Sequence, residues 1–138
     1  PVPIILYNIP VMTKLQIPPD AVARLAAHPN VMGLKDSGGD FAYFATLARL
    51  VAGQDGFTLY TGSDELLAAS LFVGGHGLIG GAVNLVPEVL AAIYHAFRGG
   101  DHGRAVALAG EVARANAANR VGQFPANMKA QYALKGLC

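Results

Sequence analysis

A lysine and a tyrosine occupy positions from which each could act on a carbonyl group. Lys35 ends the apolar run VMGLK, and Tyr7 lies near the end of the earlier apolar run PIILYNIP. A lysine at the mouth of an apolar strand is partly removed from water, which favours the neutral amine that attacks a carbonyl carbon and forms a Schiff base. A tyrosine beside it could transfer protons. The alternatives are a lysine that reaches solvent or pairs with Asp36, and a tyrosine that only packs.

The two residues fall at strand ends in a repeating pattern of apolar runs and helical segments. Strands are expected over residues 3–10, 31–35, 56–62 and 76–81, and helices over 18–30, 41–53, 63–75 and 86–100. Continuous apolar strands are typical of a parallel α/β sheet, and we expect the first strand to be buried on both faces. The units fit a small doubly wound sheet or half of an eight-stranded barrel. In both folds functional side chains gather where strands end, so Tyr7 and Lys35 should be neighbours.

Polar and glycine-rich segments follow the third and fourth predicted strands. Ser63, Asp64 and Glu65 begin a helix that Ser63 or Asp64 could cap; alternatively these side chains bind the hydroxyl groups of a polyol-like substrate. The glycines of GGHGLIGG, residues 74–81, could cradle a phosphate or let a small ligand approach the backbone. No lysine or arginine lies in this segment, which weakens the phosphate interpretation.

Composition and charge exclude several classes of partner. The 138 residues include 10 basic and 9 acidic residues, a net charge of +1, with no run of like charge to follow nucleic acid or an anionic membrane. The single cysteine, Cys138, excludes an internal disulfide, and we expect a cytoplasmic protein. His28, His76, His95 and His102 lack metal-ligand spacing, so we expect neither a metal nor a cofactor. The chain begins without methionine inside an apolar run, as expected for a piece of a longer protein.

Four motifs, taken in order, resemble the dihydrodipicolinate synthase / N-acetylneuraminate lyase family of class I aldolases. They are YNIP at 7–10, GLKDSGGD at 33–40, TGSDE at 61–65 and GGHGLIGGAVN at 74–84. The resemblance implies a (β/α)8 TIM barrel of which residues 1–100 are the second half, about strands five to eight. Residues 101–138 would be a C-terminal helical extension with a break at Pro125, expected to pack on the barrel's own wall. The family resemblance also implies a homotetramer.

The resemblance assigns roles at the predicted strand ends. Lys35 would be the Schiff-base lysine and Tyr7 the proton-relay tyrosine. Gly62 and Ile79 would line the end of the site that holds pyruvate, and Asp64 with Glu65 resembles the sugar-acid lyases. The implied ligands are a 2-oxo acid and an aldehyde. The threonine-rich loop that binds the pyruvate carboxylate in this family has no counterpart in these residues, so we expect the half barrel alone to be inactive.

Several functions remain open at this stage. Met12 stands where dihydrodipicolinate synthases carry an arginine for the aldehyde's carboxylate, and KDSGGD resembles 4-hydroxy-2-oxoglutarate aldolases. We therefore favour an aldolase of hydroxylated 2-oxo acids or sugar acids. The alternative is a 4-hydroxy-tetrahydrodipicolinate synthase of lysine biosynthesis. A non-catalytic, ligand-binding remnant and a phosphate-binding barrel enzyme that uses the glycines at 74–81 are the other possibilities.

Overall fold

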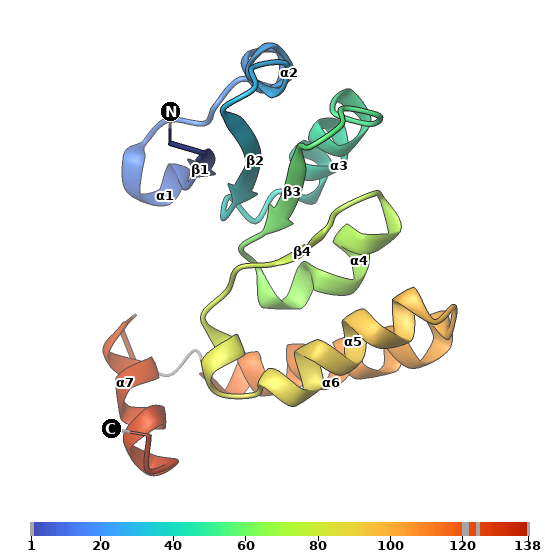
Figure 1. The fold of residues 1–138 in the computed structure, drawn as a ribbon. Coiled ribbons are helices and arrows are strands. Elements are labelled where there is room, and N and C mark those ends of the chain that lie inside the picture. The colour runs from blue at the N-terminus through green and yellow to red at the C-terminus, as the bar shows by residue number, and fades with distance from the viewer. Residues whose placement is uncertain (1, 120–121, 124, 138) are drawn as a thin grey trace.

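The sheet has four parallel strands in the order of the chain. The computed structural model describes residues 2–119, 122–123 and 125–137. The strands are β1 (Ile4–Asn8), β2 (Val31–Asp36), β3 (Thr58–Thr61) and β4 (Gly77–Leu78), each hydrogen-bonded to the next (Figure 1). A doubly wound sheet reverses its strand order at a switch point, and these strands show no reversal. The sequential order therefore favours the barrel-like arrangement over the doubly wound one.

Helices alternate with the strands, as the sequence predicts. They are α1 (Pro10–Thr13), α2 (Pro19–Ala26), α3 (Phe41–Leu50), α4 (Leu67–Phe72), α5 (Pro87–Arg98), α6 (His102–Asn119) and α7 (Ala126–Leu134), with the 3-10 helices η1 (Asp64–Leu66) and η2 (Ala82–Asn84). Prolines occupy the first turns of α2 and α5, where a missing N–H costs nothing. The Asp40 carboxylate caps α3 by accepting the N–H groups of Ala42 and Tyr43. Helix α1 was not expected, because the sequence predicts no helix before residue 18.

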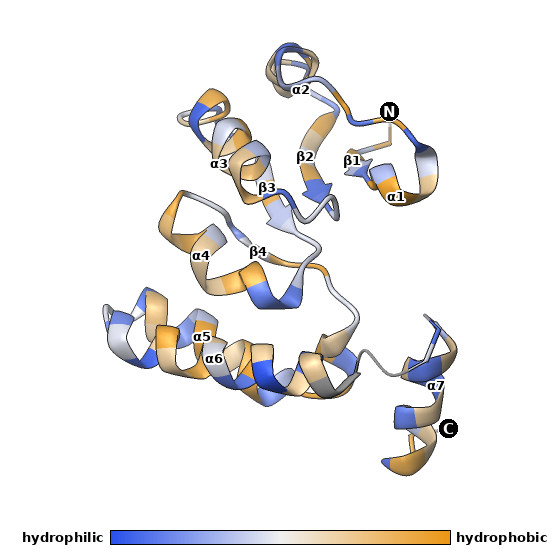
Figure 2. Ribbon diagram, turned by 180° about the vertical axis from the view of Figure 1, so that it is seen from behind, coloured by the Kyte–Doolittle hydropathy of each residue, from blue (hydrophilic) through white to orange (hydrophobic). Residues whose placement is uncertain are grey.

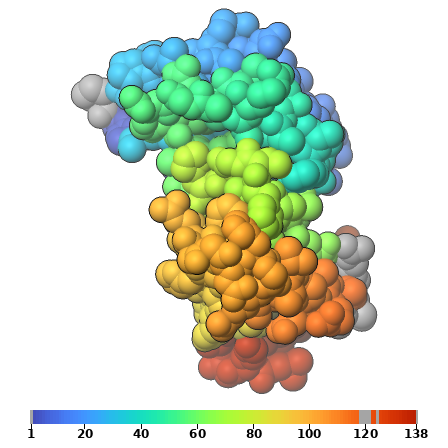
Figure 3. Space-filling view, turned by 90° about the vertical axis from the view of Figure 1, so that its right-hand side faces the viewer, coloured from blue at the N-terminus to red at the C-terminus, as the bar shows by residue number. Residues whose placement is uncertain are grey.

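The apolar side chains form two clusters that follow one another along the chain. Leu34, Leu47 and Leu59 lie fully buried between β2, β3 and α3. The second cluster joins α4, α5 and α6, and Figure 2 shows α4 almost uniformly hydrophobic. Helix α6 packs along α5 and buries Ala105 and Val112, so this alanine-rich helix packs within the fold, as expected. In Figure 3 the segments follow their chain order from one end of the molecule to the other.

Strand β1 is not buried on both faces, which corrects the expectation from its composition. About half of the surface of Ile4, Ile5 and Tyr7 is exposed: 49%, 51% and 48%. β1 lies at the edge of the sheet with β2 as its partner, and among the described residues no strand pairs with its other edge. An apolar run has the same composition whether its strand is central or at an edge, so composition alone could not distinguish the two cases.

Candidate active site

Tyr7 and Lys35 lie beside each other at the carboxyl ends of β1 and β2. They are register partners in the parallel pair. The Lys35 Nζ donates a hydrogen bond of 3.2 Å to the Tyr7 hydroxyl and lies 4.3 Å from the centre of the tyrosine ring. The predicted proximity of these residues is confirmed. Parallel strands in register bring residues at equal depth together, although 28 positions separate them in the chain.

Ser37 completes a small hydrogen-bonded group around Tyr7. Its hydroxyl donates to the Tyr7 hydroxyl oxygen at 3.4 Å. The hydrogen bond from Ser37 is the largest influence lowering the pKa of Tyr7; burial opposes it, and the hydrogen bond and positive charge of Lys35 lower the pKa further. The phenol is therefore a more ready proton donor than an ordinary tyrosine. Ser37 lies within the GLKDSGGD motif, but sequence reasoning missed it, because no local pattern distinguishes it from the other serines.

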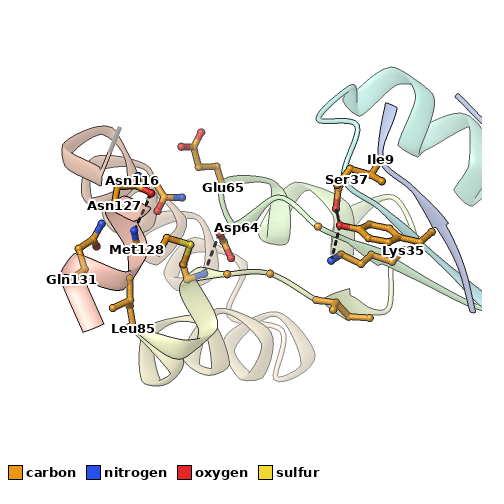
Figure 4. Close-up of a pocket in the computed structure, with 16 residues that line it drawn as sticks. Ile9, Lys35, Ser37, Asp64, Glu65, Leu85, Asn116, Asn127, Met128 and Gln131 are labelled. Carbon is orange, nitrogen blue, oxygen red and sulfur yellow. Dashed lines mark hydrogen bonds between the residues drawn. The ribbon is translucent and has the colours of Figure 1, made fainter. Parts of the chain in front are cut away.

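An open cavity of about 400 Å³ extends from this group toward the C-terminal helices (Figure 4). Its lining includes six of the seven residues that the sequence analysis named for the site: Tyr7, Lys35, Gly62, Asp64, Glu65 and Ile79. We call it the rim cavity. It lies at the carboxyl ends of parallel strands, where ligands bind in α/β folds.

Ser63 is the predicted site residue that does not line the rim cavity. Its N–H donates to the Thr61 hydroxyl at 3.1 Å, and its side chain makes no capping hydrogen bond to η1. The expectation that Ser63 or Asp64 caps the following helix is wrong. The chain enters α4 through η1, and the Asp64 carboxylate accepts an N–H from the next glycine-rich segment instead.

Only one of the two carboxylate oxygens of Asp64 has a hydrogen-bond partner among the described residues. Its Oδ2 accepts the Ala82 N–H at 3.4 Å, and its buried Oδ1 has no hydrogen-bond partner among the described residues. Burial raises the pKa of Asp64; the backbone N–H groups of Ala82 and Asp64 oppose this, the charge of Glu65 adds to it and that of Lys35 opposes it. Asp64 lines the rim cavity, but its Oδ1 is buried against the Gly80 backbone. A ligand hydroxyl that reached this oxygen would meet an acceptor without a hydrogen-bond partner.

Gly80 makes room for the Asp64 side chain. A Cβ at Gly80 would lie 2.2 Å from Asp64 Oδ1, so a side chain there would displace the carboxylate. The proximity of this acidic group is unfavourable for a phosphate at the same glycines, because the two charges would repel each other.

The far side of the rim cavity is built by helices that the sequence assigned only to packing. Asn116 from α6, with Asn127, Met128 and Gln131 from α7, faces the strands across the cavity (Figure 4). Carboxamides offer both donors and acceptors. These residues were missed because local patterns predict a helix but not where a helix beyond the Pro125 break will lie.

The described residues contain neither a candidate membrane-spanning helix nor a candidate metal cluster. No helix in residues 2–119, 122–123 and 125–137 has the length and apolarity needed to cross a membrane. The same residues contain no cluster of three His, Cys, Asp or Glu side chains suited to a metal ion. Cys138, on which the disulfide argument rests, lies outside the described residues.

Comparison with known proteins identifies the relatives of this chain. The sequence profile described as the Dihydrodipicolinate synthetase family matches residues 1–138. A 4-hydroxy-tetrahydrodipicolinate synthase from Methanoculleus marisnigri is 35% identical over 136 residues, which is 99% of this chain and 46% of the relative. The chain therefore spans about half the length of the curated relatives it matches.

Solved structures agree with this relationship. Dihydrodipicolinate synthase from Bacteroides thetaiotaomicron has a TM-score of 0.91 and 31% identity, covering 100% of this chain and 48% of that one. YagE of E. coli K12, a family member in complex with pyruvate, has a TM-score of 0.74 and 32% identity, covering 78% and 37%. A 2-keto 3-deoxygluconate aldolase from Picrophilus torridus has a TM-score of 0.83 and 27% identity, covering 96% and 48%. The fold is a partial TIM barrel of this family; its assignment to the second half stays a prediction.

Proposed function

Because the chain belongs to the dihydrodipicolinate synthetase family, we propose that Lys35 is the nucleophile of a Schiff-base lyase acting on pyruvate or another 2-oxo acid. The observation that most directly supports this is the 3.2 Å hydrogen bond between Lys35 Nζ and the Tyr7 hydroxyl in the rim cavity. The pyruvate complex of YagE supports the choice of 2-oxo acid. The activity is that of the full-length protein, and a homotetramer stays a prediction for it.

The chemistry begins with attack of the neutral Lys35 amine on the carbonyl carbon of the 2-oxo acid. A carbon–nitrogen bond forms, and the carbonyl electron pair moves to oxygen, which takes a proton from the Tyr7 hydroxyl. The nitrogen then returns a proton to the Tyr7 oxygen. Tyr7 passes this proton to the new hydroxyl group, which leaves as water while the nitrogen electron pair forms the carbon–nitrogen double bond of the iminium. The iminium withdraws electrons, so the adjacent carbon can lose a proton and attack an aldehyde carbonyl; the reverse sequence breaks the same carbon–carbon bond. Tyr7 is placed to move these protons because its hydroxyl touches the amine.

Gly62 and Ser37 shape the part of the rim cavity that lies beside Tyr7 and Lys35. The Gly62 N–H is already used by the Asp36 carbonyl oxygen at 2.6 Å, and a Cβ at Gly62 would lie 2.0 Å from the Ser37 hydroxyl oxygen. The missing side chain at position 62 therefore preserves the place of Ser37 beside Tyr7. In this proposal Gly62 and Ile79 form the narrow wall against which a small 2-oxo acid packs.

The names of the curated relatives favour 4-hydroxy-tetrahydrodipicolinate synthase as the reaction. This reverses the preference drawn from the sequence, where Met12 argued against an aldehyde that carries a carboxylate. Met12 is 64% exposed and does not line the rim cavity, so it neither supplies nor blocks a carboxylate contact there.

A second candidate is an aldolase of hydroxylated 2-oxo acids. The observation that favours it is that Asp64 lines the rim cavity and that its buried Oδ1 has no hydrogen-bond partner among the described residues. One structural relative is a 2-keto 3-deoxygluconate aldolase. The two reactions are separated by measuring pyruvate consumption with a carboxylate-bearing aldehyde and with a polyhydroxylated one. Only the second reaction should weaken when Asp64 is replaced by asparagine.

The Schiff base itself is tested by borohydride reduction in the presence of pyruvate, followed by intact mass measurement of the full-length protein. We expect one pyruvate per chain, with no adduct in Lys35→Ala. Lys14→Ala is the matched control, because Lys14 lies on the surface and its Nζ donates to the Val11 carbonyl away from the rim cavity. A folded protein that gains no mass with pyruvate or related 2-oxo acids would favour the non-catalytic, ligand-binding alternative.

A further inference from the structure

The residues that follow Tyr7 and Lys35 form a polar pair buried behind them. Asn8 and Asp36 are the next register partners of β1 and β2, and their side chains are 0% and 3% exposed. Successive side chains of a strand point to opposite faces, so this pair lies on the side of the sheet away from the reactive pair. Asn8 Nδ2 donates to Asp36 Oδ1 at 2.7 Å.

The pair also binds the segments that leave the two strands, and Asp36 Oδ1 accepts a second hydrogen bond in doing so. Asn8 Oδ1 accepts the Ile17 N–H at 3.0 Å, and Asp36 Oδ1 accepts the Gly38 N–H at 3.0 Å. Gly38 fits closely, because a Cβ there would lie 3.1 Å from the Asp36 carboxylate. The pair therefore fixes the chain just beyond both strand ends.

The main chain of the same pair reaches the residues around Tyr7. The Asn8 carbonyl accepts the Ser37 N–H at 2.8 Å, and the Asp36 carbonyl accepts the Gly62 N–H at 2.6 Å. Ser37 in turn donates its hydroxyl to Tyr7. Displacement of Asn8 or Asp36 would thus move the ends of β1, β2 and β3 relative to one another.

A buried carboxylate bonded to neutral donors is a costly way to stabilise a fold. Removing a charge from water is unfavourable, and well-packed apolar side chains in place of the buried charge often leave the fold as stable or more stable. The directional hydrogen bonds of the pair offer what apolar packing does not, a fixed register at the strand ends.

We propose that Asn8 and Asp36 are positioning residues whose hydrogen bond keeps the Tyr7 hydroxyl and the Lys35 amine within reach of each other. The inference rests on the proposed function, since it gives the pair a role in the same site. Neither residue lines the rim cavity, so both act through their neighbours.

An exchange of the two side chains tests this role. Asn8→Asp alone sets two carboxylates against each other in a buried site, which should push the strand ends apart. Adding Asp36→Asn restores the hydrogen bond between the two side chains: the amide at position 36 donates to the carboxylate at position 8, which still accepts the Ile17 N–H. The bond from the Gly38 N–H is weakened, because Asp36 Oδ1 accepts both this N–H and the Asn8 amide in the unchanged protein. Asp36→Asn alone is a milder disturbance, because it leaves two amides that can still form one hydrogen bond.

Two measurements on the full-length protein report whether the Tyr7 hydroxyl and the Lys35 amine keep their relative positions. The first is the pKa of Tyr7. For each variant, the phenolate absorbance is titrated with pH, and the absorbance of the same variant carrying Tyr7→Phe is subtracted to leave the signal of Tyr7 alone. The second is the maximal rate of pyruvate adduct formation, measured beside the pyruvate concentration that gives half of it. Asn8→Asp should raise the pKa of Tyr7 and lower the maximal rate about 100-fold, because a displacement of about 1 Å can cost this much. The exchanged variant should recover most of both values, because it remakes the bond between the two side chains. The pyruvate concentration that gives half of the maximal rate should change little in any variant.

Two results would overturn the proposal. Folded single variants with the Tyr7 pKa and the rate of the unchanged protein would show that the pair does not position Tyr7. A folded exchanged variant no better than the single variants would show that the hydrogen bond is not what matters. If Asn8→Asp does not fold, Asp36→Asn and the exchanged variant make the same comparison. Absence of any adduct in the unchanged protein would count against the proposed function. The Tyr7 titration requires no enzymatic activity, so it would still test the positioning role of Asn8 and Asp36.

Discussion

Replacing Gly62 with alanine should separate the Ser37 hydroxyl from Tyr7. The new Cβ would lie 2.0 Å from Ser37 Oγ, 2.9 Å from Ser37 Cβ and 3.1 Å from the Asp36 carbonyl oxygen, whereas real Cβ contacts are essentially never shorter than 3.0 Å. The hydroxyl must therefore move by about 1 Å. Its hydrogen bond to Tyr7 is already 3.4 Å long, so this displacement breaks it.

The consequences can be given a size. Overpacking of this kind costs about 1–3 kcal/mol, and the flexible hydroxyl places Gly62→Ala near the lower end. Loss of one hydrogen bond costs about 1 kcal/mol, so the rate of pyruvate adduct formation should fall by about fivefold to tenfold. The pKa of Tyr7 should rise, because the hydrogen bond from Ser37 is the largest influence that lowers it.

The assay combines adduct formation, the absorbance titration of Tyr7 and urea unfolding. Ser37→Gly should give the same loss of rate with less loss of stability, and Gly62→Ala should lower the rate no further in that background. Gly103→Ala is the matched control, since its Cβ would meet its nearest neighbour at an ordinary 3.9 Å. The reasoning is refuted if Gly62→Ala leaves both the rate and the Tyr7 pKa unchanged.

Three further predictions concern single side chains. Tyr7→Phe should slow adduct formation by about 100-fold or more, because it removes the proton donor beside the amine; an unchanged rate would exclude the relay. Asp64→Asn should raise the free energy of unfolding at pH 7 by about 0.5 kcal/mol, a small gain because solvent screens part of the charge of this partly exposed carboxylate. Burial raises the pKa of Asp64, so the ionised carboxylate destabilises the folded state. The gain in stability of Asp64→Asn should therefore vanish in acid below pH 3.8, where the carboxyl group is protonated in both states. A gain that persisted there would show that ionisation of Asp64 is not its cause. Burial, followed by the charge of Asp36, raises the pKa of Tyr43 from 10.0 to about 12. The folded state therefore holds the phenol proton more tightly than the unfolded state does, and the free energy of unfolding should fall between pH 10 and 12. In Tyr43→Phe, which also loses the 2.7 Å bond to the Ile17 carbonyl, unfolding measured across this range should show a smaller fall; an identical fall would rule out Tyr43 as its source.

The sequence was most informative where one local rule determines geometry. Strand ends in parallel β/α units must meet at one rim, so Tyr7 and Lys35 could be paired before any coordinates, and Gly62, Asp64 and Ile79 could be placed near them. The alternating pattern of strands and helices was equally clear, because each segment is short and bounded by glycine or proline.

Features set by distant contacts could not be predicted in this way. The exposure of Ile5 depends on what pairs with β1, which composition does not reveal. Ser63 has the type of a helix cap, but the Thr61 hydroxyl takes its N–H and the Asp64 carboxylate turns to Ala82. Gln131 lines the rim cavity only because α7 lies across from the strands, and no local pattern fixes that path.

The most direct test of the account is to locate the reduced pyruvate adduct by peptide mass spectrometry. In the full-length protein, fragmentation of the modified peptide identifies the lysine that carries the adduct, and it distinguishes Lys35 from Lys14, Lys129, Lys135 and any lysine outside these 138 residues. The account predicts a single modification at Lys35, lost in Lys35→Ala and strongly slowed in Tyr7→Phe. An adduct at another lysine, or an adduct at Lys35 that forms equally fast without the Tyr7 hydroxyl, would contradict it.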